Sequence, residues 1–187
     1  MKVNIIGRAP GWQAAPKDGI CWGLNSHILK RPYNVIFDMH DIEEVFTDFR
    51  TDNWKLVKGP RRDLLPESIK KCEENDVTIF SLGQNADRMC VAYPIDKIKN
   101  YFGSDYFGSG IPYMIALAIY QGFTEIDIWG VFLSVSDEYA YQKPSIEFWI
   151  GMAMGRGIKV TVHGMTRLLK NIRDQLYGYQ TKQEVAE

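Results

Sequence analysis

The 187-residue sequence lacks the features that mark several large classes of protein. Its three cysteines, Cys21, Cys72 and Cys90, include no CxxC pair and no spacing typical of a metal site, so neither a disulfide scaffold nor a zinc module is expected. Apolar runs such as residues 111–120 are about half the length needed to cross a bilayer, and we expect no membrane span. Twenty-two basic and twenty-three acidic side chains give a formal charge of −1. No overall electric field therefore favours nucleic acid or an anionic membrane.

No signal peptide precedes Val3, and together with the sparse cysteines this favours a cytoplasmic location. The length suits one domain with a core of its own, since 45% of the residues are hydrophobic. We predict a single domain over residues 1–179 and a frayed polar tail over residues 180–187.

Short β-rich runs alternate with helical periodicities along the chain. We predict strands at residues 3–6, 20–25, 33–39, 77–82, 125–131 and 158–162. We predict helices at residues 42–49, 68–75 and 94–102, a longer helix after Ser109, a helix opened by Pro144 after a loop over residues 132–143, and a helical start to the tail from Thr166. Residues 8–19 are predicted to be a loop with at most one helical turn. The alternation predicts an α/β fold, a single Rossmann-like domain with a mainly parallel sheet and helices on both faces.

The helix after Ser109 gives the strongest local signal. Five apolar residues share one of its faces, Pro112 lies in its first turn and Gly122 follows its end. These five are Ile111, Met114, Ile115, Ala118 and Ile119. Before the helix, the sequence Phe107-Gly-Ser-Gly110 leaves backbone N–H groups free to receive an anion such as phosphate. The alternative is that Ser109 only caps the helix.

Other candidate residues follow predicted strands, where parallel sheets bind ligands. Asp38, His40 and Asp41 offer a general base or a Mg²⁺ site, or simply end a strand with polar groups. Tyr139 and Tyr141 would donate hydrogen bonds to a leaving phosphate, or close the sheet edge.

His163 follows the last strand and would act as a base near neutral pH, or lie on the surface as an ordinary histidine. The glycines at Gly7 and Gly11 lack the spacing of dinucleotide and P-loop motifs, but they permit close approach of a ligand to the backbone. The basic turn at residues 58–62 is accompanied by no nucleic-acid-binding motif, so no nucleic-acid site is expected.

Residues 107–131, FGSGIPYMIALAIYQGFTEIDIWGV, and the stretch Glu138-Tyr-Ala-Tyr141 form a recognisable arrangement. Four features follow one another in this arrangement: a Ser-Gly helix start, an amphipathic helix, a Gly-Phe-Thr-Glu-Ile turn into a strand, and a Tyr-Ala-Tyr loop. This order resembles the bacterial CMP-sialic-acid-dependent sialyltransferases and the related 6-hydroxymethylpterin pyrophosphokinase-like proteins. The early Gly-x-x-Pro turn and the Asn after the second strand extend the resemblance to about two-thirds of the chain.

The resemblance implies a nucleotide site lined by Gly7, Pro10, Asn25, Ser109 and Gly110. It also implies that Tyr139 lies near the phosphate and that His163 stands about where the sialyltransferases keep a catalytic histidine. Four positions depart from the family pattern: Arg8 replaces an Asn, Gly11 a Ser, Phe132 a carboxylate and Ser134 a second tyrosine.

The function expected on these grounds is that of a nucleotide-dependent transferase, most like a small glycosyltransferase with a nucleotide-activated sugar donor. Arg8, Ser109 and the helix dipole would hold phosphate, the two tyrosines would assist the leaving group, and His163 or His40 would be the base. A Mg²⁺ ion carried with the donor is left open, as is a homo-oligomer. The alternative is a non-catalytic protein that sequesters or senses a nucleotide, since the losses at Phe132 and Ser134 remove expected catalytic groups.

Overall fold

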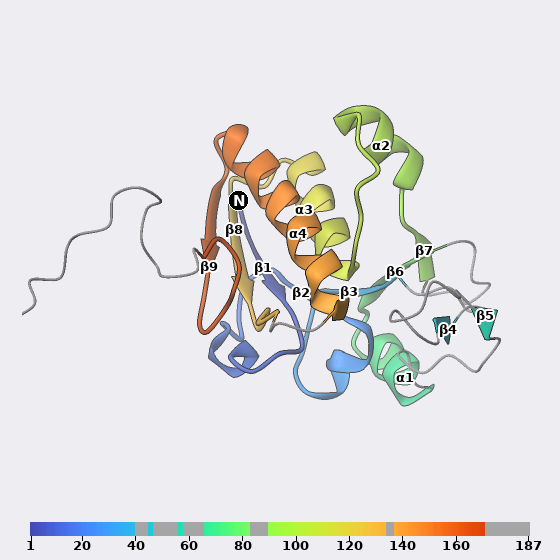
Figure 1. Cartoon of the computed structure of the whole chain (residues 1–187). Coiled ribbons are helices and arrows are strands. Elements are labelled where there is room, and N and C mark those ends of the chain that lie inside the picture. Colours follow the sequence, from blue (N-terminus) through green and yellow to red (C-terminus); the bar gives the residue numbers. More distant parts are fainter. Residues whose placement is uncertain (40–44, 47–55, 58–65, 83–89, 134–136, 171–187) are drawn as a thin grey trace, which may run out of the picture.

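A computed structural model describes residues 1–39, 45–46, 56–57, 66–82, 90–133 and 137–170, shown in colour in Figure 1. Seven parallel strands form its main sheet, in the order β7-β6-β3-β2-β1-β8-β9. The strands are β1 (Lys2–Ile6), β2 (Cys21–Leu24), β3 (Val35–Asp38), β6 (Thr78–Ser81), β7 (Cys90–Ala92), β8 (Glu125–Trp129) and β9 (Lys159–Val162). The predicted parallel α/β sheet is confirmed.

The order in which strands are added to the sheet changes direction at β1, which lies inside the sheet. It first adds β2, β3, β6 and β7 on one side of β1, and then returns to add β8 and β9 on the other side. The loops after β1 and β8 lie at this reversal, and such a point is where open α/β sheets bind ligands.

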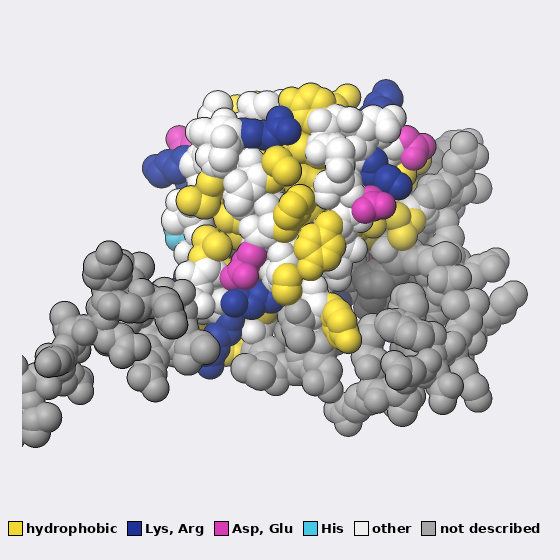
Figure 2. Space-filling model, turned by 45° about the horizontal axis from the view of Figure 1, so that its top comes forward, with side chains coloured by type: hydrophobic (Ala, Val, Ile, Leu, Met, Phe, Trp, Pro, Cys, Tyr) yellow, Lys and Arg dark blue, Asp and Glu magenta, His cyan; other side chains and the backbone are white. Residues whose placement is uncertain are grey.

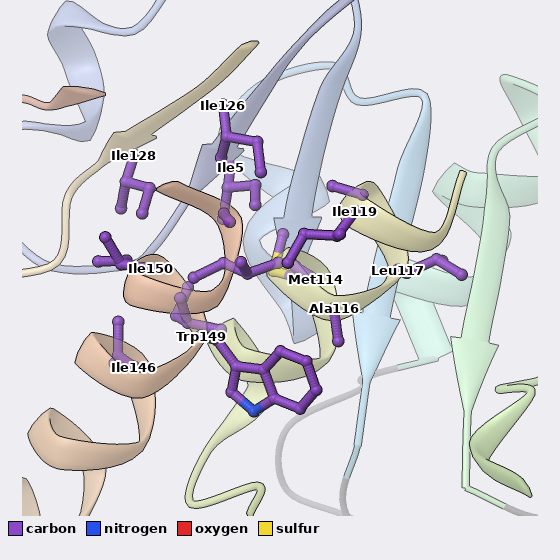
Figure 3. Packing of buried hydrophobic residues seen from close by; sticks show 14 of the residues in the cluster. Ile5, Met114, Ala116, Leu117, Ile119, Ile126, Ile128, Ile146, Trp149 and Ile150 are labelled. Carbon is purple, nitrogen blue, oxygen red and sulfur yellow. The ribbon is translucent and has the colours of Figure 1, made fainter. Parts of the chain in front are cut away.

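Helices α3 (Gly110–Tyr120) and α4 (Asp137–Gly155) cover one face of the sheet, with α2 (Ile95–Phe102) beside α3. Figure 3 shows Trp149 and Met114 from these helices packed with Ile5 and Ile128 from the sheet. All four side chains are completely buried. Burying a large apolar side chain stabilises a fold by about 1.5–3 kcal/mol, so this layer holds the start of α3 firmly on the sheet.

The opposite face carries a smaller core under α1 (Pro66–Glu74) and two short 3-10 helices, η1 (Trp12–Ala14) and η2 (Asn25–Leu29). Strand residues that alternate with those of the first face point here, such as Ile6, Ile36 and Ile79. Helical segments therefore cover both faces of the sheet, as predicted.

The helical layer also exposes apolar side chains. Figure 2 shows them gathered on the outer surface seen from above the helices. Exposed aromatic and methionine side chains on and between α2, α3 and α4 are those of Tyr101, Tyr106, Tyr120, Tyr141, Phe148 and Met154. These helices are therefore apolar on more than the face that meets the sheet.

Four predictions about elements are corrected. The helix predicted at residues 42–49 is wrong at Val45–Phe46, which form β4 and pair with β5 (Leu56–Val57); the rest of that segment lies outside the described residues. Helix α4 begins at Asp137, so Pro144 lies inside it. Residues 166–170 form no helix. Strand β7 was not predicted, because three residues are too few to show a pattern.

Candidate functional site

The loops that follow β1 and β8 are joined at the reversal point of the sheet. Gly7 N–H donates to Trp129 O (2.8 Å) and Ala9 N–H donates to Gly130 O (2.9 Å). A Cβ at Gly7 would collide with Gly130 O, and Gly130 has a φ of +61°, so both positions require glycine. Gly7 therefore allows two loops to touch, and its contact with a nucleotide stays a prediction.

The start of α3 presents unused hydrogen-bonding groups. Ser109 occupies the N-cap position, but its side chain makes no capping hydrogen bond. Its Oγ is buried and has no partner among the described residues. The backbone N–H groups of Ser109 and Gly110 also form no hydrogen bond with any residue that the structure describes. These donors, with the dipole of α3, make a place that favours an anion.

Gly108 is an exception to the expectation that both glycines of the motif offer free amides. Its N–H donates to Ser145 Oγ at 2.8 Å. Among the described residues at this helix start, the backbone N–H groups without a hydrogen bond are therefore those of Ser109 and Gly110.

Asn25 follows β2 next to the start of α3. A Cβ at Gly110 would lie 2.7 Å from Leu24 Cδ2, so α3 begins against the residue that precedes Asn25. Asn25 is 6% exposed and has a φ of 50°. Asparagine is among the few non-glycine residues that adopt this left-handed region readily, so the turn after β2 suits this residue type. The structure thus brings the predicted Asn25 and Ser109–Gly110 to the same edge of the sheet.

Three positively charged side chains act on His27, two residues after Asn25. Burial, together with the charges of Arg8, Arg31 and Lys30, lowers the pKa of His27 to about 4. His27 is therefore neutral at pH 7, and its Nδ1 lies 2.5 Å from the Tyr33 hydroxyl. Arg8 is exposed. The expected contact of Arg8 with a phosphate stays a prediction.

Tyr141 lies beside the start of α3. A Cβ at Gly108 would lie 3.0 Å from Tyr141 O, and the Tyr141 side chain is 65% exposed. Both predicted tyrosines lie in the first turns of α4 and not in a loop. The side chain of Tyr139 lies outside the description, so its position near a phosphate stays a prediction.

His163 lies on the other face of the sheet from α3. Its Nε2 is 3.1 Å from Asp127 Oδ2, and its ring stacks on Trp129 with centroids 3.7 Å apart. Asp127 and Trp129 alternate along β8 with Ile126 and Ile128, which face α3 and α4. The structure therefore does not bring His163 together with Ser109.

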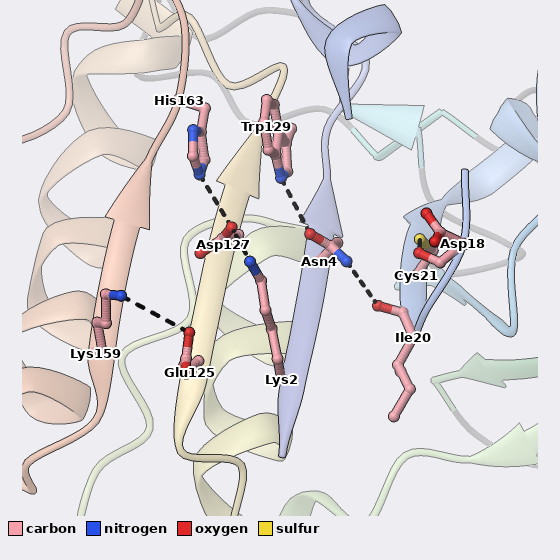
Figure 4. A network of polar contacts seen from close by, with 10 residues as sticks. All are labelled: Lys2, Asn4, Asp18, Ile20, Cys21, Glu125, Asp127, Trp129, Lys159 and His163. Atoms are coloured by element: carbon pink, nitrogen blue, oxygen red, sulfur yellow. Dashed lines mark hydrogen bonds and ion pairs between the residues drawn. The ribbon is translucent and has the colours of Figure 1, made fainter. Parts of the chain in front are cut away.

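A polar network surrounds His163 (Figure 4). Lys2 Nζ lies 2.7 Å from Asp127 Oδ2, and the hydrogen bond to this carboxylate raises the pKa of Lys2. Trp129 Nε1 donates to Asn4 Oδ1 at 3.3 Å. The nearly buried carboxylate of Asp127 is thus balanced by Lys2 and oriented toward His163.

Of the remaining predicted residues, the structure describes Asp38 and Pro10. Asp38 is completely buried at the end of β3, opposite Ser81 of β6. Pro10 is exposed in the loop after β1. His40, Asp41 and the basic turn at residues 58–62 lie outside the described residues.

Three residues of this region were missed by sequence reasoning. Ser145, His27 and Asp127 are all buried polar residues that act through contacts with distant or neighbouring elements. His27 had one available signal, its position two residues after Asn25. Ser145 and Asp127 had none, because their partners are set by helix and strand packing.

No helix among the described residues combines the length and apolar character that a membrane crossing requires. No group of three His, Cys, Asp or Glu side chains in that part of the chain is arranged to hold a metal ion.

The fold and this edge define a Rossmann-like α/β protein. No family model matches the sequence, and no curated protein does either. Among solved structures, the chain is similar to the sialyltransferase CstII from Campylobacter jejuni in complex with the substrate analogue CMP-3FNeuAc, with 14% identity and a TM-score of 0.48 over 86% of this chain and 79% of that chain. It is similar also to the sialyltransferase CST-II in complex with a trisaccharide acceptor and CMP, with 16% identity and a TM-score of 0.49 over 87% of this chain and 80% of that chain. At these identities the likeness concerns the fold alone.

Proposed function

We propose that the protein is a nucleotide-dependent transferase whose donor, a nucleotide-activated sugar, is held at the start of α3. The observation that carries the proposal is the buried, unpartnered Oγ of Ser109 at a helix N-terminus that makes no side-chain cap. A buried polar group without a partner is destabilising by about 1–3 kcal/mol, which a bound ligand would relieve. The resemblance of residues 107–141 to nucleotide-sugar enzymes points to the same place.

The residues around this point suit a nucleotide. The amides of Ser109 and Gly110 would receive a phosphate oxygen, and Arg8 would add a charge-assisted contact. Asn25 would offer an amide to the sugar or the base. Tyr141, whose backbone lies against Gly108, would assist the leaving phosphate.

The second candidate is a nucleotide-binding protein without catalysis. It is favoured by the position of His163, the predicted base, on the opposite face of the sheet from Ser109. It is favoured also by Phe132 and Ser134, which replace the carboxylate and the tyrosine of the family pattern. In this case the same site would sequester or sense a nucleotide.

Calorimetry with a panel of CMP, UMP, AMP and GMP, with and without Mg²⁺, tests the binding that both candidates share. We expect at least one to bind, and Arg8→Ala and Ser109→Ala each to weaken it by about tenfold, the loss expected for a hydrogen bond to a charged group. Arg156→Ala is the matched control, because Arg156 stacks over Tyr101 and Phe102 away from this edge. If no member of the panel binds, or if all three variants bind alike, the site is wrong.

A donor-hydrolysis assay separates the two candidates. The protein is incubated with CMP-, UDP- and GDP-sugars, and release of free nucleotide is followed. Release that exceeds the rate without protein supports a transferase, while tight binding of the nucleotide without release supports the non-catalytic protein. His163→Ala and His40→Ala then show whether either histidine is the base.

A further inference from the structure

The segment that leads into α3 is fastened to α4 by a buried serine. Ser145 is completely buried, and its Oγ donates to Tyr106 O (2.9 Å) and accepts from Gly108 N–H (2.8 Å). Trp149, one turn further along α4, donates from Nε1 to the same Tyr106 O at 2.8 Å. Two side chains of one helix therefore satisfy the backbone of a segment that is far away in the sequence.

The attachment leaves little freedom. A Cβ at Gly108 would lie 3.0 Å from Ser145 Cβ, so a larger residue at position 108 would crowd α4. Phe107 stacks between Trp149 and Tyr113, with ring centroids 5.0 Å and 4.4 Å apart. Since Trp149 is completely buried, it is a fixed point of the core and not a mobile surface residue.

The residue that follows this attachment is Ser109. Its own side chain makes no capping bond, so the direction of its amide is set by its neighbours and not by itself. Gly108 is held on one side by Ser145, and Gly110 is held on the other side against Leu24. Binding groups keep a productive geometry only when the residues behind them are fixed by packing and hydrogen bonds.

We propose that Ser145 is a positioning residue, which holds the Tyr106–Gly108 backbone on α4 and thereby orients the amides at the start of α3 toward the phosphate of a nucleotide. Ser145 itself does not touch the ligand. This inference rests on the proposed function, because it assumes that a phosphate is received at Ser109 and Gly110.

The test compares a nucleotide with its nucleoside. Dissociation constants for CMP and cytidine, or for the tightest-binding pair of the panel above, are measured on the wild-type protein and on Ser145→Ala. We expect Ser145→Ala to weaken the nucleotide by about tenfold and to leave the nucleoside within about twofold, since only the phosphate depends on the oriented amides. A purely structural role would weaken both by the same factor.

A second test variant and a control variant accompany Ser145→Ala. Trp149→Phe keeps an aromatic ring but removes the Nε1 donor to Tyr106 together with part of the ring volume, and we expect a nucleotide-specific loss of about threefold beyond any loss shared with the nucleoside. Ser68→Ala is the matched control, because Ser68 of α1 is also completely buried but its Oγ has no hydrogen-bond partner among the described residues. Should Ser145→Ala fail to fold, Trp149→Phe decides the question.

The outcomes distinguish a failure of the proposed function from a failure of this inference alone. A wild-type protein that binds no nucleotide overturns the proposed function and, with it, this inference. A wild-type protein that binds, with Ser145→Ala and Trp149→Phe unchanged or weakened equally for nucleotide and nucleoside, overturns this inference alone.

Discussion

His27 shows how one buried side chain makes this protein sensitive to acid. The ring is 6% exposed, lies 2.5 Å from the Tyr33 hydroxyl and meets Trp12 edge-on. Burial first, and then Arg8, Arg31 and Lys30, lower its pKa from 6.5 to about 4. The cations that would attract an anionic ligand therefore also prevent His27 from taking up a proton.

We predict a loss of stability between pH 7 and pH 4 that depends on His27. The unfolded chain takes up this proton near pH 6.5 and the folded chain only near pH 4. The free energy of unfolding therefore falls as the pH is lowered through this window, by about 3 kcal/mol from this group. Urea unfolding at several pH values measures the fall.

His27→Gln removes the titrating ring and should flatten that fall by a similar amount. His163→Gln is the control, because His163 is a partly exposed histidine outside this cluster. If His27→Gln and the wild-type protein lose stability in parallel, the proposed origin of the acid sensitivity is wrong.

The individual residues of the candidate site were predictable only in part. The glycine motif before α3 pointed to Ser109 and Gly110, and the end of the second strand pointed to Asn25. The structure brings these three residues to one edge of the sheet. The occupation of the Gly108 amide by Ser145 was not predictable, because the two residues are 37 positions apart and meet only when α4 packs on α3.

Elements with a clear pattern were predicted well. Strand β1 is a β-rich run that ends at a glycine, and α3 has a proline in its first turn and a glycine beyond its end. Helix α4 was predicted to be shorter, because proline is favoured at the first position of a helix and Pro144 was placed there. Residues 42–49 show that helical spacing of apolar residues does not exclude a strand, since Val45–Phe46 pair with Leu56–Val57.

Pro144 inside α4 leads to a prediction for the helix. Proline cannot donate a hydrogen bond to the preceding turn, and its ring clashes with the carbonyl group four residues earlier. Pro144 is exposed, so no core contact depends on its ring. We expect Pro144→Ala to raise the free energy of unfolding by about 1–3 kcal/mol, as measured by urea denaturation.

Pro112→Ala is the comparison variant, because Pro112 lies in the first turn of α3, where its missing N–H is not needed, and because its buried ring packs in the core. This variant should bring no gain in stability. A Pro144→Ala variant without a gain would mean that the first turns of α4 contribute nothing to the fold.

The whole molecule is organised by a sheet that joins distant parts of the sequence. Strand β1 pairs with β2 and with β8, and one core contains Trp22 of β2 and Trp149 of α4. We therefore predict that residues 1–179 unfold as one unit. Tryptophan fluorescence and far-ultraviolet circular dichroism should give coincident urea transitions, whereas two separated transitions would show that the chain has two independent parts.

The position of β1 has a consequence for synthesis of the chain. Among the strands of this sheet β1 comes first in the sequence and lies inside the sheet, but its neighbour β8 is made more than a hundred residues later. Until that stretch leaves the ribosome, a nascent chain carries β1 with one edge unpaired and open to association with other polypeptides. Translation that stalls before Trp129 should therefore release products that precipitate or recruit chaperones, even though they already contain most of the strands.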